Sequence, residues 1–215
     1  MIRRMFLSRL GAAAFLGFSG AERRVPDASA APGSESRWQP ARHAADDWLD
    51  ERPGRHRMFF DALTPKGAEE SLGYADNFFL ANRSGYAIDS PDLAVVVCFR
   101  HHATTFAFND AMWAKYGVAF AKAIGVTDPK SGQAPTANLH AADLSAAVKQ
   151  GVHFAVCDMA SHYFSEVAAT HTGGNADAVY KELKANAVAN SHFVAAGIVA
   201  VNRAQERGYS IAYVG

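Results

Sequence analysis

This sequence contains few cysteines, its charges balance, and it has few long apolar runs. Only two cysteines occur in 215 residues, which is too few for a disulfide scaffold. The 21 basic and 21 acidic residues cancel, so nothing indicates the basic face that nucleic-acid binding requires. Beyond the N-terminus, no stretch approaches the roughly 20 apolar residues that cross a bilayer. We therefore expect no nucleic-acid partner, and no membrane association once a leader has been removed.

The chain does contain enough apolar material for one core. Hydrophobic residues make up 49% of it and aromatic residues 11%. At the usual size of roughly 100–200 residues per domain, this length corresponds to a single domain. We assign that domain to residues 56–215.

The N-terminus has the features of a twin-arginine export signal. Arg3 and Arg4 are adjacent, and an Ala- and Gly-rich apolar run follows over residues 10–18. That run is too short and too weakly apolar for a membrane anchor. Small residues at 28–30 offer a cleavage site. We therefore interpret residues 1–30 as a signal peptide and expect a periplasmic protein that is exported already folded.

The segment 31–55 is interpreted as a polar, weakly ordered lead-in to the domain. It combines proline, glycine, serine and scattered charge, a composition that buries little apolar surface. Only Trp38 and the pair Trp48-Leu49 are suited to docking on the domain.

Strand-like and helix-like segments alternate along the rest of the chain, which is typical of an open parallel sheet with helices on both faces. Leu93–Phe99 is the clearest strand, because its unbroken apolar run predicts burial on both faces. We predict a doubly wound α/β domain of about five parallel strands. The other predicted strands are His56–Ala62, Val152–Cys157, Ser191–Val194 and Tyr209–Val214. The predicted helices are Gly67–Arg83, a segment capped by Asn109 or Asp110, Ala141–Gln150, Met159–Ala169, Ala176–Ala189 and Ala195–Arg207.

Three segments, taken together, resemble the DsrE/DsrF-like family. They are DLAVVVCFRHHATTFAF at 92–108, GVHFAVCD at 151–158 and HFVAAGIVAVNRAQERGY at 192–209. The resemblance implies a flavodoxin-like fold. For the better-known members it also implies sulfur relay, in which a strand-end cysteine carries a persulfide within an oligomer. Cys157 is the residue that carries over as that cysteine. The export signal, the loop at 125–138 and the histidine-rich strand ends distinguish this chain from the sulfur-relay members.

Ligands of open α/β sheets bind outside the carboxyl ends of the strands. We take Cys157, His101 and His102 as candidate catalytic residues there. Asp61, Asp158 and His192 are candidates for lining the same pocket.

Cys157 is placed where a strand passes into a helix. The free N–H groups and the dipole at a helix N-terminus stabilise the thiolate that nucleophilic sulfur transfer needs. The neighbouring carboxylate of Asp158 opposes that effect. The alternative is that Cys157 is a small packing residue, as we expect Cys98 to be.

His101 and His102 are expected to continue a strand, so at most one of them would point into a given pocket. With Cys157 and His162, one imidazole would form either a base–nucleophile pair or a site for a soft metal such as zinc or copper. No compact metal-binding motif is present, so the metal is left unassigned. No Gly-rich phosphate loop follows the first strand at 62–67, and no cofactor is predicted.

The leading hypothesis is an exported sulfur carrier, or sulfurtransferase-like protein, that receives sulfane sulfur on Cys157 from a donor protein or passes it to an acceptor protein. The alternatives are a non-catalytic module that binds a small ligand or a soft metal, and a structural oligomer of the same fold. We expect a homo-oligomer in each case.

Overall fold

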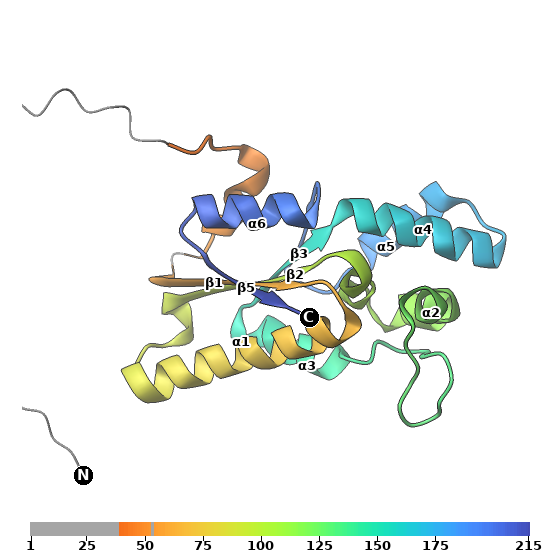
Figure 1. Ribbon diagram of the computed structural model, residues 1–215, viewed down its shortest axis with the longest axis horizontal. Helices are drawn as coiled ribbons and strands as arrows, with labels where there is room; N and C mark the ends of the chain where they lie inside the picture. The colour runs from red at the N-terminus through yellow and green to blue at the C-terminus, as the bar shows by residue number, and fades with distance from the viewer. Residues whose placement is uncertain (1–38, 53) are drawn as a thin grey trace, which may run out of the picture. The chain divides into compact units, whose positions relative to one another are not determined.

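The computed structural model describes residues 39–52 and 54–215, so the predicted signal peptide and Trp38 lie outside the described residues. Five strands form one parallel sheet in the order β4-β3-β2-β1-β5 (Figure 1). Helices lie on both sides of it, so the prediction of a flavodoxin-like α/β fold is confirmed. The strands are β1 (His56–Ala62), β2 (Leu93–Phe99), β3 (His153–Cys157), β4 (Ser191–Val194) and β5 (Ser210–Val214).

The central strand β2 is buried along its whole length. All seven of its residues are buried, as the apolar run from Leu93 to Phe99 predicts. Because successive side chains of a strand point to opposite faces, β2 contributes to two separate hydrophobic cores.

The helices begin and end close to the predicted residues. Thr64, Asn109 and Asn175 each accept a backbone N–H at the start of a helix, as capping residues do. The α-helices of the described residues are α1 (Pro65–Tyr86), α2 (Asp110–Ile124), α3 (Ala141–Gln150), α4 (Asp158–Thr172), α5 (Ala176–Ala185) and α6 (Gly197–Glu206).

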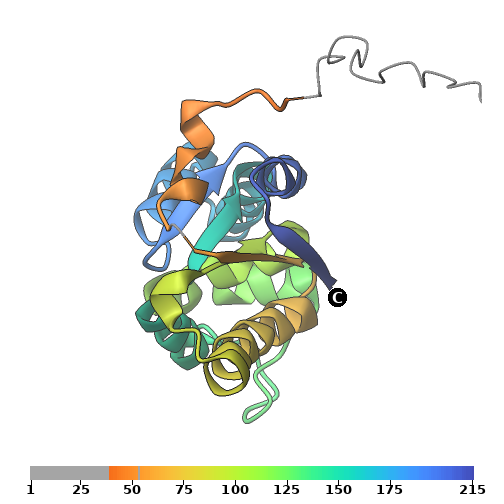
Figure 2. The ribbon, with the colours of Figure 1, turned by 90° about the vertical axis from the view of Figure 1, so that its left-hand side faces the viewer.

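The two faces of the sheet are covered unequally. Helices α1 to α5 all contribute to the larger core, whereas α6 contributes to the smaller one. Figures 1 and 2 show α6 on the opposite side of the sheet from α1. That second face also holds η1, a 3₁₀ helix over Ala44–Asp50. No helix in the described part of the chain combines the length and the apolar character of a membrane span.

The part of the predicted lead-in that the structure describes, residues 39–52 and 54–55, contains η1, where the pair Trp48-Leu49 docks on the domain as expected. Trp48 and Leu49 are buried in the second core, and the compact unit begins at Pro40. Arg207, itself buried, reaches Asp50 at 3.1 Å, and the Tyr209 hydroxyl donates to the Leu49 carbonyl at 2.6 Å. Two apolar residues and a buried arginine are enough to fix a segment that is polar on average.

Candidate functional site

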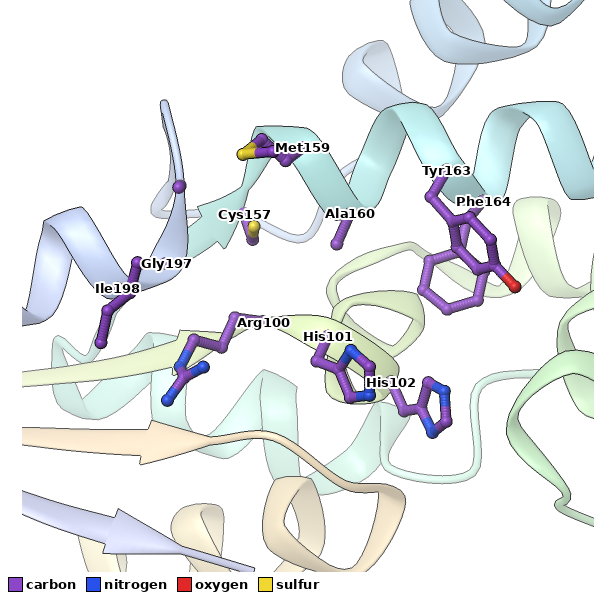
Figure 3. A pocket seen from close by; sticks show the side chains of 11 residues that line it. Arg100, His101, His102, Cys157, Met159, Ala160, Tyr163, Phe164, Gly197 and Ile198 are labelled. Carbon is purple, nitrogen blue, oxygen red and sulfur yellow. The ribbon is translucent and has the colours of Figure 1, made fainter.

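A cavity of about 490 Å³ lies at the carboxyl ends of β2 and β3, between the first turns of α4 and α6 (Figure 3). The register explains its position. Phe99 is opposite Val156, so Arg100 and Cys157 leave neighbouring strand ends side by side. The 3₁₀ helix η3 (His101–Ala107) follows β2 and closes one side. The lining residues are Arg100, His101, His102, Cys157, Met159, Ala160, Tyr163, Phe164, Ala196, Gly197 and Ile198.

Cys157 is the last residue of β3 and the N-cap of α4, as the sequence predicts. Its side chain lines the cavity, toward Arg100 and His101 (Figure 3). Only 7% of the Cys157 surface is exposed, because α4 and the β4–α6 turn enclose the side chain. Cys98, by contrast, is completely buried. Burial raises the pKa of the Cys98 thiol well above its usual value, and the nearby Asp61 carboxylate raises it further.

His101 and His102 both line the cavity, which corrects the expectation that only one of them would point into it. That expectation rested on strand alternation, but the two residues open η3 instead. Their rings stack with centroids 4.2 Å apart and planes inclined by 11°. Burial lowers the pKa of His102, and the neighbouring His101 lowers it further, so the His102 imidazole is neutral and able to accept a proton near neutral pH. His101 has a left-handed φ of 54°, which L-residues rarely adopt.

Asp158 does not line the cavity, although it directly follows Cys157. Its carboxylate accepts a hydrogen bond from the Tyr180 hydroxyl at 2.5 Å and lies 3.9 Å from the Lys184 ammonium. His162 approaches the same carboxylate at 3.7 Å and stacks on Tyr180. The structure thus places His162 beside Asp158 and Tyr180, and not among the residues that line the cavity. The negative charge that would oppose a thiolate is paired with groups of α5.

Asp61 is buried beside the cavity, where it holds Arg100. The guanidinium donates two hydrogen bonds to the carboxylate, of 2.6 and 2.9 Å. This bidentate pair fixes the arginine that lines the cavity. The sequence alone does not indicate a role for Arg100, because a basic residue after a strand has no distinctive pattern.

Two helices begin at the cavity without a side-chain cap. Neither Cys157, at the start of α4, nor Ala196, at the start of α6, accepts a capping hydrogen bond. The first N–H groups of a helix have no partner within the helix, and its dipole is positive there. Two such ends favour an anionic ligand, whereas the charge of Arg100 is already paired with Asp61.

The mouth of the cavity is apolar. Met159, Tyr163 and Ile198 line it and are 68%, 52% and 60% exposed. Large apolar side chains exposed together indicate an interaction surface. Sequence periodicity did not reveal them, because each lies on the outer side of an otherwise ordinary amphipathic helix.

His192 is not at the cavity. It lies opposite Ala155 in the sheet, and its ring stacks on Trp48 of η1. The structure thus brings together Cys157, His101 and His102, places Asp61 behind Arg100, and places Asp158 and His192 elsewhere.

The fold and this cavity define a flavodoxin-like domain with a cysteine and two histidines at the carboxyl ends of its strands. No family model and no curated protein matches the chain. A solved structure, that of a protein of unknown function, MTH1491 from Methanobacterium thermoautotrophicum, is similar to it with 13% identity and a TM-score of 0.39. The similarity covers 74% of this chain and 98% of that one.

Proposed function

We propose that the chain is an exported, DsrE-like protein that carries sulfane sulfur on Cys157. One observation carries the proposal: Cys157 lines a cavity together with two imidazoles, an arginine and two uncapped helix N-termini. A nucleophilic thiolate, a nearby base and an anion-binding environment are what transfer of sulfur from an anionic donor requires. The resemblance of the three sequence segments supports the same chemistry.

The transfer is a displacement at sulfur. His101 or His102 accepts the thiol proton, and the Cys157 thiolate attacks the outer sulfur of a donor such as thiosulfate. A bond forms between Cys157 Sγ and that sulfur, the donor's S–S bond breaks, and sulfite leaves with the electron pair. The product is a Cys157 persulfide. An acceptor thiolate then attacks the outer sulfur and releases the Cys157 thiolate again.

The exposed apolar mouth supports a protein as the donor or acceptor. Met159 and Tyr163 on α4 and Ile198 on α6 surround the opening through which sulfur must pass. A partner that packs against these side chains would shield the persulfide from water. A second copy of the chain would satisfy the same surface, so a homo-oligomer belongs to the proposal.

Intact-mass measurement after incubation with thiosulfate or a polysulfide tests the proposal. We expect the full chain to gain one sulfur, which a thiol reductant removes. Cys157→Ser should abolish the gain and Cys98→Ser should leave it unchanged.

A folded protein that gains no sulfur, or that gains it only on Cys98, would overturn the sulfur-carrier function. The ligand-binding and structural alternatives would then remain.

A further inference from the structure

Two histidines and a glutamate converge on the α6 face of the sheet, away from the cysteine cavity. His153 begins β3, His192 lies in β4, and Glu51 directly follows η1. A ligand atom from each of the three lies within 4.8 Å of those of the other two. His153 Nδ1 and His192 Nε2 are 2.9 Å apart. His153 lies four residues before Cys157 on β3, about 13 Å along the strand.

The two imidazoles are held in place by their surroundings. Their planes are inclined by only 7°, and Trp48 stacks on His192 with centroids 4.2 Å apart. Both rings are half-buried, whereas Glu51 is exposed and open to solvent. Among the described residues, the few buried polar side-chain atoms without a hydrogen-bond partner include Nε1 of Trp48, whose ring stacks on His192. Unsatisfied buried polar atoms mark places where a further polar group belongs.

The two imidazoles contact each other through the ring nitrogens that would both ligate a metal. Without a metal, one facing nitrogen must carry the hydrogen of the 2.9 Å contact. Metal binding requires that ring to adopt its other tautomer.

We propose that His153, His192 and Glu51 form a binding site for a divalent transition metal, with zinc as the ion that fits the donors best. Two imidazoles and one carboxylate, with a water as fourth ligand, complete the tetrahedral coordination that zinc prefers. Zn–N bonds of 2.0–2.1 Å place two tetrahedral nitrogens about 3.3 Å apart, so the observed 2.9 Å needs only a small opening. Oxygen-preferring Mg²⁺ and Ca²⁺ do not suit two imidazoles.

The metal would link η1 to β3 and β4 at the edge of the sheet. Glu51 extends from the end of η1, whereas the two histidines belong to β3 and β4. One ion bound to all three would therefore link the segment before β1 to the two strands furthest from it in the sheet. Since metal binding stabilises only the folded form, zinc should raise the unfolding temperature.

Zinc titration of the purified, chelator-treated full chain tests the site. We expect about one equivalent to bind, measured by competition with a chromophoric chelator and by elemental analysis. His153→Gln and His192→Gln should weaken zinc binding by more than the roughly 10–100-fold that is lost when a hydrogen-bond partner of a ligand is removed. Glu51→Gln changes only an exposed side chain, so it separates loss of a ligand from loss of the fold.

Matched variants distinguish this site from the cysteine cavity. His171→Gln, at an exposed position at the end of α4, and Cys157→Ser should bind zinc like the unchanged protein. Cobalt bound at the proposed site should show tetrahedral d–d absorption without a thiolate-to-cobalt band. Absence of zinc binding would overturn the proposal. So would a thiolate band that disappears in Cys157→Ser, or zinc binding that survives in all three ligand variants.

Discussion

Arg100 and Asp61 form a bidentate ion pair that joins the end of β2 to β1. Nε and Nη2 of the arginine lie 2.6 and 2.9 Å from the two carboxylate oxygens. The aliphatic part of Arg100 packs against Gly197 so closely that a Cβ at that glycine would lie 2.4 Å from the Arg100 Cβ. The pair therefore holds Arg100 against the first turn of α6, and with it one wall of the cavity.

Asp61→Asn should reduce the free energy of unfolding by about 2–3 kcal/mol, because it leaves the largely buried guanidinium without its charged acceptor. The midpoint of urea unfolding measures the change. Lys66→Met is the matched control, since it breaks the exposed Lys66–Glu69 pair and should alter the midpoint little. Equal effects of the two substitutions would show that burial does not distinguish the pairs.

The two cysteines should differ in their reaction with alkylating reagents. Cys157 lines the cavity, whereas Cys98 is completely buried and its thiol pKa is raised. We expect Cys157 to be modified in the folded protein at neutral pH and Cys98 only after unfolding. Peptide mass mapping after timed labelling measures both rates. Faster labelling of Cys98 in the folded state would contradict the assignment of Cys157 to an accessible cavity.

Acidification should destabilise the protein through its half-buried histidines. Burial against the core lowers the pKa of His140 from 6.5, although Glu69 and Asp143 partly oppose the shift. Below about pH 6.5 the unfolded chain binds a proton that the folded chain does not, so stability falls until the pH passes the lowered folded pKa. One such group contributes at most about 1.4 kcal/mol per pH unit.

Replacing His140 by Gln should make this fall shallower, as measured by urea unfolding between about pH 7.5 and pH 5.5. His171→Gln serves as the control at an exposed position. An unchanged slope in His140→Gln would remove His140 as a source of the acid sensitivity.

Replacement by glycine should cost less stability at His101 than at His102. Its left-handed φ costs an L-residue roughly 1–2 kcal/mol, which glycine avoids, although glycine gives back part of that gain by its freedom in the unfolded chain. We expect His101→Gly to leave stability unchanged or raise it by up to about 1 kcal/mol. His102→Gly should lower it. Sulfur transfer from thiosulfate to Cys157 should be slower in His101→Gly if the strained backbone positions the His101 imidazole to accept the thiol proton.

The export prediction depends on residues outside those described. Replacing Arg3 and Arg4 together by Lys should abolish periplasmic export and leave the fold intact, because we interpret the pair as part of a targeting signal. Cell fractionation and circular dichroism measure the two effects. The equivalent change at Arg23 and Arg24 should leave export intact. A Lys-Lys variant that still reaches the periplasm would contradict the twin-arginine interpretation.

The sequence predicted strands better than it predicted the cavity. Long apolar runs dictate burial by themselves, and β2 begins and ends at the predicted residues. The turn after β2 was missed because contacts from distant segments fix it: the backbone N–H of Arg100 donates to Ala62, and that of Ala103 donates to Leu63. The orientation of Asp158 likewise depends on Tyr180 of α5. Local patterns contain no information on such contacts.

The strand order has a consequence for how the chain reaches this structure. β1 pairs with β2, which follows it closely, and with β5, which begins only at Ser210. During synthesis, one edge of β1 therefore keeps its N–H and C=O groups unpaired until almost all of the described domain has left the ribosome. Unpaired edges attract other strands, so nascent chains at this stage are prone to misassociation. The pairing of β5 with β1 is therefore a late, long-range step in folding.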